Sequence, residues 1–210
     1  MNAHILLVEG TCGTGKSTLI RALLTRHVTE EERPRTLVHL SQAHTYFPLA
    51  SADLPQPPGK RQYREHVRRL LRLTDLAGDP GLEPRRWFTV FGLIDTLHLT
   101  HAFRPGVLSW AELGYVDQHL AGRGARMVFL RASPETLWER VIVGRGSPAF
   151  FAYQRKFGGS AEEVHAYYVR EQEEMEKLAL RSKLRTLFLS AEALPGVLAG
   201  EAYGFWKGTP

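Results

Sequence analysis

Short apolar runs alternate with amphipathic segments along the chain. Apolar runs of strand length occur at residues 5–8, 36–40, 87–94, 125–130 and 185–189. Between them, apolar residues recur at helical spacing and predict helices over residues 17–27, 62–76, 109–121, 133–143 and 160–182. This alternation predicts an α/β fold of three layers, in which helices cover both faces of a parallel sheet. The run at 87–94 is almost entirely apolar, which is typical of a strand buried on both faces.

Three of the predicted helices begin at capping residues. Ser109 and Ser160 are each followed three positions later by a glutamate, which is the capping-box pattern. Ser133 precedes a proline, a residue favoured at the first position of a helix.

Four segments have no clear period. Residues 41–60 are rich in proline, alanine and serine, and a segment of this length without a pattern is either functional or disordered. Residues 96–106 are expected to form an active-site loop or a partly helical connection. Residues 144–159 are basic and contain glycine and aromatic residues, which suits a mobile lid. The tail beyond residue 189 is weakly patterned.

Composition narrows the class of protein. The 210 residues suit one α/β domain over 1–210, and the single cysteine excludes an internal disulfide and a multi-cysteine zinc site. The chain contains no run of about 18 apolar residues and no signal-peptide pattern, so we expect no membrane span and a cytoplasmic location. The net charge is +5 without a long basic run carrying interleaved aromatics. This favours a phosphate-handling site with solvated helix faces over a nucleic-acid surface.

The first apolar run leads into a glycine-rich loop. Gly10, four further residues, and then Gly15, Lys16 and Ser17 make the pattern G-x-x-x-x-G-K-[ST] between a predicted strand and a predicted helix. In a phosphate-binding loop, successive backbone N–H groups form an anion-binding nest, and the helix adds its positive N-terminal end. Lys16 is expected to reach the β- and γ-phosphates, and the Ser17 hydroxyl to ligate Mg²⁺. The pattern therefore predicts a site for ATP, or another nucleoside triphosphate, and Mg²⁺, rather than a glycine-rich turn that binds nothing. The predicted nucleotide-binding residues are Gly10, Thr11, Cys12, Gly13, Thr14, Gly15, Lys16, Ser17 and Thr18.

Two carboxylates follow predicted strands. Asp95 ends the buried run 87–94 and should lie at the carboxyl edge of the sheet, where ligands of such folds bind. There it could support Mg²⁺ or accept the proton of an attacking hydroxyl, and the sequence does not separate these roles. Glu9 directly precedes the loop. It could polarise the acceptor, support Mg²⁺ or satisfy local amides.

Basic residues gather around the proposed lid, which extends over about residues 140–159. Arg140 and Arg145 are expected to stabilise the charge that develops on the phosphoryl group, the alternative being a solvated basic face. Arg104 suits bidentate contact with a phosphate or carboxylate of the acceptor.

Candidate acceptor residues also occur in an insert over about residues 41–80. Arg68 belongs to a row of arginines on one helix face, which would be solvated or would bind a phosphate-bearing acceptor. His44 and Tyr46 follow the second strand and could contact a planar or sugar-like acceptor. His98 and His101 are expected to have packing roles, since no Cys or carboxylate cluster accompanies them.

These motifs resemble those of thymidylate kinases and deoxynucleoside kinases. Residues 8–18 are similar to the family's opening, with Glu-Gly before the loop, and residues 130–140 resemble the entry to its lid. Asp95 matches the aspartate of the D-R-[YH] element of thymidylate kinases by its place after the third strand. The resemblance implies a P-loop kinase fold with a five-stranded parallel sheet and a small lid. It also implies transfer of the ATP γ-phosphate to a small acceptor.

The chain departs from the family at two places. Thr96 stands where thymidylate kinases have the arginine that holds the acceptor's phosphate, and the E-R-S element of deoxynucleoside kinases is missing.

Three hypotheses follow. The first is an ATP- and Mg²⁺-dependent phosphotransferase for a small acceptor, a nucleoside or nucleotide being favoured. A kinase for another hydroxylated molecule, such as an antibiotic, is the alternative within this class. The third is a nucleotide-dependent switch, against which the lack of a guanine-specifying N-K-x-D motif counts. The acceptor, the choice between ATP and GTP and the oligomeric state, a homodimer included, stay open.

Overall fold

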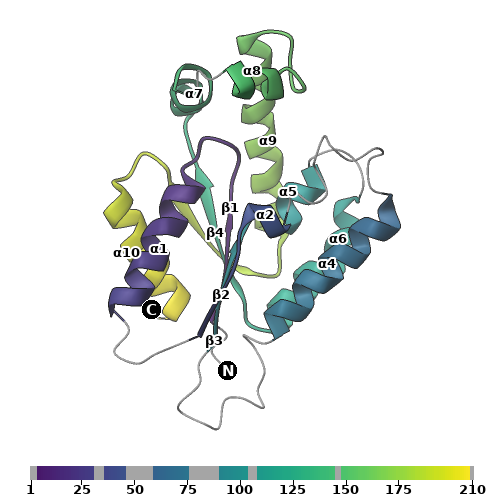
Figure 1. Ribbon diagram of the computed structural model, residues 1–210, viewed down its shortest axis with the longest axis vertical. Helices are drawn as coiled ribbons and strands as arrows, with labels where there is room; N and C mark the ends of the chain where they lie inside the picture. Colours follow the sequence, from purple (N-terminus) through teal and green to yellow (C-terminus); the bar gives the residue numbers. More distant parts are fainter. Residues whose placement is uncertain are drawn as a thin grey trace.

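A five-stranded parallel sheet forms the middle layer of the protein in a computed structural model (Figure 1). The structure describes residues 4–30, 36–45, 59–75, 90–103, 108–144 and 148–208. The strands are β1 (Ile5–Glu9), β2 (Thr36–Leu40), β3 (Val90–Asp95), β4 (Arg126–Arg131) and β5 (Arg185–Ser190), in the spatial order β2-β3-β1-β4-β5. The predicted five-stranded parallel sheet is therefore confirmed, although residues 87–89 lie outside the described residues and β3 begins at Val90.

The strand order places the functional segments next to each other. β1 pairs with β3 on one side, where Val8 is opposite Asp95, and with β4 on the other, where Glu9 is opposite Phe129. The segment after β1 crosses one face of the sheet and the segment after β3 crosses the opposite face, so the carboxyl ends of these two neighbouring strands form a topological switch point, at which ligands of α/β sheets bind.

One face of the sheet is covered by α1 (Lys16–Glu30) and α10 (Pro195–Lys207) (Figure 1). Leu6 and Val8 of β1 point to this face, where they pack with side chains of both helices. The neighbouring residues Ile5 and Leu7 point to the opposite face. This alternation is the period of two that a pleated strand imposes.

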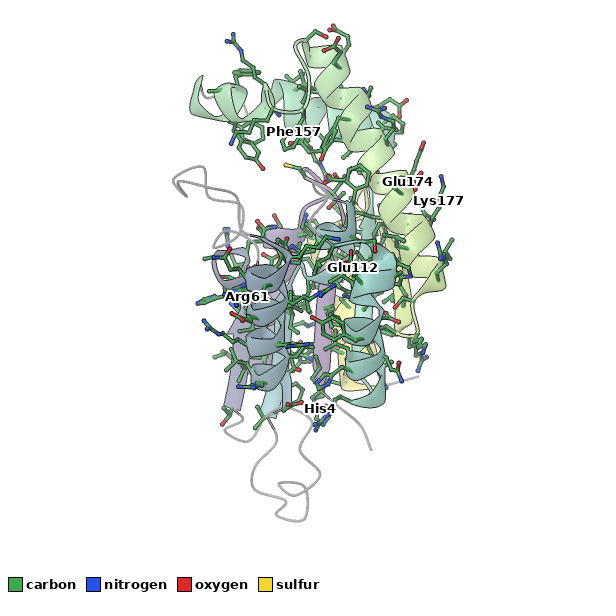
Figure 2. The ribbon with its side chains drawn as sticks, turned by 90° about the vertical axis from the view of Figure 1, so that its right-hand side faces the viewer. His4, Arg61, Glu112, Phe157, Glu174 and Lys177 are labelled. Atoms are coloured by element: carbon green, nitrogen blue, oxygen red, sulfur yellow. The ribbon has the colours of Figure 1, made fainter. Side chains whose placement is uncertain are left out.

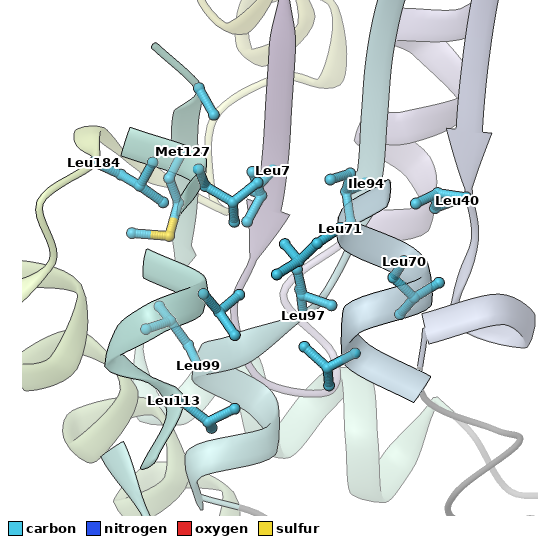
Figure 3. Packing of buried hydrophobic residues seen from close by; sticks show 14 of the residues in the cluster. Leu7, Leu40, Leu70, Leu71, Ile94, Leu97, Leu99, Leu113, Met127 and Leu184 are labelled. Carbon is cyan, nitrogen blue, oxygen red and sulfur yellow. The ribbon is translucent and has the colours of Figure 1, made fainter. Parts of the chain in front are cut away.

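The opposite face is covered by α4 (Lys60–Asp75), α5 (His98–Phe103), α6 (Trp110–Gly122) and the C-terminal part of α9 (Ala161–Arg181). Leu7 and Ile94 of the sheet meet Leu71 and Leu97 in this core (Figure 3). The short helix α2 (Gln42–Thr45) follows β2 within the segment for which no period was found.

Three short helical elements, together called the lid region after the lid predicted over about residues 140–159, lie above the carboxyl edge of the sheet (Figure 1). They are α7 (Pro134–Leu137), a π-helical stretch η1 (Trp138–Val143) and α8 (Pro148–Gln154), which pack against the N-terminal half of α9. The predicted cap at Ser133 is present, and Ser109 makes a complete capping box with Glu112. At α9 the box is only half formed, because the Glu163 carboxylate accepts from the Gly159 N–H instead of the Ser160 N–H. No helix in the described ranges is long and apolar enough to cross a membrane.

The weakly patterned tail forms a helix, α10, that completes one face of the sheet. Its buried residues have the expected helical spacing and are Leu198, Ala199, Ala202, Tyr203 and Trp206. Glycines at every fourth position from 196 to 204 lower the helix propensity and hide this pattern. Packing against α1 and the sheet stabilises the helix in spite of them.

We predict that Trp206→Ala lowers the free energy of unfolding by about 3–5 kcal/mol, the usual cost of truncating a large buried aromatic residue. Trp206 is fully buried, packs edge-on against Phe91, and its Nε1 donates to the carbonyl of His4 at 2.9 Å. Chemical denaturation followed by circular dichroism measures this loss. The matched control Val197→Ala, at a half-exposed position of the same helix, should change the free energy by less than about 0.5 kcal/mol. Equal effects of the two substitutions would contradict the packing role of α10.

Candidate functional site

The loop between β1 and α1 has a conformation that only glycine adopts readily at three of its positions. Gly10 has φ +141°, Gly13 has φ +86° and Gly15 has φ +88°. A Cβ atom on Gly10 would lie 2.7 Å from the carbonyl oxygen of Leu130, and one on Gly13 would lie 2.5 Å from a methyl group of Val141. Gly10 and Gly13 therefore let the loop pack closely against β4 and η1.

Lys16 is the first residue of α1, and its side chain turns back over the loop. It is buried, and its Nζ donates to the carbonyl oxygens of Gly10 at 2.7 Å and Thr11 at 2.8 Å. The Thr14 hydroxyl donates to the same Thr11 carbonyl at 2.9 Å. Ser17 and Thr18, in the first turn of α1, are exposed. The ammonium group thus lies over the loop, next to backbone amides at a helix N-terminus.

Asp95 lies beside the loop, at the end of β3. Its side chain is almost fully buried, and its Oδ1 has no hydrogen-bond partner among the described residues. Burial raises the pKa of Asp95 from 3.8 to about 6; the positive charge of Lys16 opposes this shift, and the carboxyl group of Glu9 adds to it. The side chain is therefore a buried carboxyl group with unused hydrogen-bonding capacity, close to a cation.

Glu9 has a different environment from Asp95. It is fully buried, and it accepts hydrogen bonds from the Leu97 N–H at 2.7 Å and the Thr100 hydroxyl at 2.9 Å. Burial raises the pKa of Glu9, while His98, these two hydrogen bonds and Lys16 oppose the shift. Both carboxylate oxygens thus hold the turn that follows Asp95. Of the three roles considered for Glu9, these contacts agree with the hydrogen bonding of local amides.

The turn after Asp95 is strained. Thr96 has φ +56° and is the only non-glycine residue in the described ranges with a positive φ. For a β-branched residue this conformation costs on the order of 1–3 kcal/mol. Its N–H donates to the carbonyl of Val8 at 3.0 Å, and the Thr45 hydroxyl donates to the carbonyl of Asp95 at 2.8 Å. The N–H and the C=O of the Asp95–Thr96 peptide group are therefore both hydrogen-bonded, the first to β1 and the second to α2.

Arg140 of η1 joins the loop to the segment that follows β5. Its guanidinium donates to the carbonyl of Gly13 at 3.4 Å and to the carbonyl of Ala191 at 2.8 Å. It lines a cavity of about 390 Å³ beside the loop. The other lining residues are Gly13, Thr14, Gly15, Thr18, Leu19, Ala191, Glu192, Ala193, Leu194, Pro195 and Leu198.

The remaining candidates are placed as follows. His44 is exposed on α2, and its Nδ1 lies 3.0 Å from the Ser41 hydroxyl. Arg68 is exposed on α4, where its charge acts on Tyr115 of α6. Cys12 is half-buried against the apolar cluster at the base of the lid. The candidates outside the described residues are Tyr46, Arg104 and Arg145.

Sequence reasoning missed two parts of this region. One is the segment 191–195, which follows the last strand and lines the cavity beside the loop; no sequence motif marks it. The other is Glu171 of α9, which accepts a hydrogen bond from the Thr11 hydroxyl. Its signal was a charged residue in the apolar stripe of the predicted helix.

The residues of the site fit a nucleotide with a divalent cation. The loop amides and Lys16 suit phosphate oxygens, and the exposed Ser17 hydroxyl and the Asp95 carboxyl group are oxygen donors, which Mg²⁺ prefers. Within the described residues, no group of three or more His, Cys, Asp or Glu side chains could hold a metal ion alone.

Comparison with known proteins shows the fold. No family model and no curated protein sequence matches the chain. The structure is similar to that of the YorR protein from Bacillus subtilis, solved in complex with phosphorylated GDP, with a TM-score of 0.56 and 16% identity over 94% of this chain and 92% of that one. It is also similar to a gluconokinase from Sinorhizobium meliloti 1021, with a TM-score of 0.55 and 14% identity over 98% and 92% of the two chains. The chain has a P-loop kinase-like fold.

We predict that Asp95→Asn removes a pH dependence of stability. Because the pKa is raised, the folded chain binds this proton more tightly than the unfolded chain between pH 3.8 and about 6. The contribution is complete below pH 3.8 and is lost as pH rises through 6. At pH 8 the variant should therefore be more stable than the wild type, by at most about 3 kcal/mol, and at pH 3.5 the difference should vanish. Denaturant unfolding of both proteins across this range measures it.

Asp117→Asn is the control of opposite sign. Burial opposes the ionisation of Asp117, but hydrogen bonds from His98, Ser182 and Lys183 lower its pKa overall. Its stabilising contribution is present above pH 3.8 and is lost as pH falls, so this variant should be less stable than the wild type at neutral pH. A constant difference between Asp95→Asn and the wild type at every pH would contradict the account of Asp95.

Proposed function

We propose that the protein is an ATP- and Mg²⁺-dependent phosphotransferase that moves the γ-phosphate to a small acceptor. One observation supports this above the others: Lys16, its glycine loop and the Asp95 carboxyl group, whose Oδ1 has no hydrogen-bond partner among the described residues, converge at the carboxyl edge of β1 and β3. A phosphate-binding cation beside a carboxyl group that can handle a proton is the arrangement that phosphoryl transfer to a hydroxyl requires.

The donor nucleotide is assigned to the loop and its neighbouring cavity. Lys16 exchanges the carbonyls of Gly10 and Thr11 for phosphate oxygens, while the loop amides and the first turn of α1 hold the rest of the phosphate chain. The cavity of about 390 Å³ falls in the usual size range of small-molecule sites, and its apolar side chains suit a base. Ser17 would hold Mg²⁺, which would neutralise phosphate charge, and support of this ion is the alternative to the role of Asp95 described next.

Asp95 and Arg140 serve the transfer itself. With a pKa of about 6, Asp95 is ionised at neutral pH and is a stronger base than an ordinary aspartate. It accepts the proton of the acceptor hydroxyl as the new oxygen–phosphorus bond forms and the bond to the leaving diphosphate breaks. Arg140, held against the loop by the Gly13 carbonyl, supplies positive charge on the side of the donor.

A nucleoside or nucleotide is the acceptor class we favour, with another hydroxylated small molecule as the alternative. One of the two similar structures was solved with a nucleotide, phosphorylated GDP, and the other is a gluconokinase. Thr96 supports a hydroxyl-bearing acceptor. It is a buried neutral residue at the position where thymidylate kinases carry a phosphate-binding arginine.

Lys16→Ala should reduce acceptor-dependent ATP turnover at least about 100-fold, because the loop loses the cation that stabilises the transferring phosphoryl group. A coupled assay of ADP release over a panel of nucleosides, nucleotides, sugar acids and hydroxylated antibiotics measures this. Lys177→Ala, which removes an exposed lysine paired with Glu174, is the matched control and should leave turnover unchanged. Thermal unfolding of both variants separates loss of chemistry from loss of fold.

Two results would overturn the proposal. One is a folded Lys16→Ala protein with wild-type turnover. The other is a wild-type protein that consumes no ATP with any acceptor on the panel.

A further inference from the structure

A buried carboxylate interrupts the apolar face of the helix that carries the lid. The buried residues of α9 are spaced for one face of a helix and are Val164, Tyr168, Glu171, Met175 and Ala179. Glu171 is 1% exposed. A charged side chain in such a stripe destabilises a fold unless it is hydrogen-bonded, and an apolar residue of similar size would normally serve stability as well or better.

One partner of Glu171 is Thr11, the first variable residue of the phosphate loop. The Thr11 hydroxyl donates to the Glu171 carboxylate across 160 positions of sequence. The Thr11 carbonyl accepts from Lys16 Nζ at 2.8 Å and from the Thr14 hydroxyl at 2.9 Å. Thr11 is therefore the point at which α9 is connected to the lysine of the loop.

The same turn of α9 is fixed to the end of another strand. The Gln172 side-chain amide accepts from the Ala132 N–H and donates to the Ala132 carbonyl, both at 2.8 Å. Towards its N-terminus, α9 contributes Val164 and Tyr168 to the apolar cluster that includes Val141 of η1, with Cys12 of the loop packed against it. Figure 2 shows α9 rising from the flank of the sheet to the lid, with Glu174 and Phe157 labelled. One helix thus contacts the phosphate loop, the end of β4 and the lid.

We propose that Glu171 is a positioning residue. Through its hydrogen bond with Thr11 it holds the start of the phosphate loop in the conformation that binds phosphate, and it links the loop to α9. This inference rests on the proposed function. When Lys16 turns to phosphate oxygens, the Thr11 carbonyl loses one of its partners, and the hydroxyl bond to Glu171 keeps the turn in place. Pre-organisation of this kind raises affinity by reducing the ordering that binding requires.

Two measurements test this role of the Thr11–Glu171 hydrogen bond. Titration calorimetry gives the affinity of each variant for a non-hydrolysable ATP analogue with Mg²⁺, and thermal unfolding gives its melting temperature. Glu171→Leu should weaken analogue binding about tenfold while the melting temperature stays the same or rises, a split that a purely structural role does not produce. Glu171→Gln keeps an acceptor oxygen and should lose less than about threefold. Thr11→Val removes only the hydroxyl and should also lose about tenfold; it carries the test if Glu171→Leu fails to fold.

The double variant Thr11→Val/Glu171→Leu should bind no more weakly than either single variant, because both remove the same interaction. Glu174→Leu is the control on the same helix; Glu174 is exposed and should leave affinity unchanged.

Two results would overturn the positioning role of Glu171 and leave the proposed function standing. One is wild-type affinity in Glu171→Leu, and the other is a double variant in which the affinity losses of the two single variants multiply. A wild-type protein that binds no analogue would overturn both.

Discussion

The parallel pairing of β1 with β3 is the constraint on which the rest of the site depends. Because Val8 lies opposite Asp95, the phosphate loop and the carboxyl group emerge side by side from the same edge of the sheet. A slip of one residue would turn Asp95 to the other face of the sheet. The side chains of β3 prevent this slip, because Phe91 and Leu93 fill one core and Ile94 fills the other. The packing of the two cores thus positions the phosphate loop and Asp95 next to each other.

Buried charged groups at this edge are tolerated because most of them are hydrogen-bonded. Lys16 donates to two backbone carbonyls of the loop, Glu9 accepts from the Leu97 N–H next to strained Thr96, and Glu171 accepts from the Thr11 hydroxyl. Asp95 differs, since one of its oxygens has no hydrogen-bond partner among the described residues and its pKa is raised to about 6. A group that is left unsatisfied while its neighbours are satisfied is a reasonable place to expect a ligand.

Much of the fold could be predicted from the sequence, because strands, caps and glycines are local signals. The strand before Asp95 and the loop from Gly10 to Ser17 follow from apolar runs and spacing alone. Helix α10 was missed because its glycines hide a pattern that only packing against the sheet makes stable. The contacts of Arg140 with Ala191 and of Glu171 with Thr11 join distant segments, so no local pattern contains them. The roles of Arg104, Arg145 and Tyr46 stay predictions, as does that of Arg68.

The central claim is that the γ-phosphate is transferred to a small molecule and not to water. Phosphorus NMR of the protein with ATP, Mg²⁺ and a mixture of nucleosides, nucleotides and sugar acids tests this directly. The account predicts that the γ-phosphate signal of ATP declines while ADP signals and a new phosphoester or phosphoanhydride signal grow in equal amounts. ATP loss that yields only ADP and inorganic phosphate, or no ATP loss at all, would contradict it.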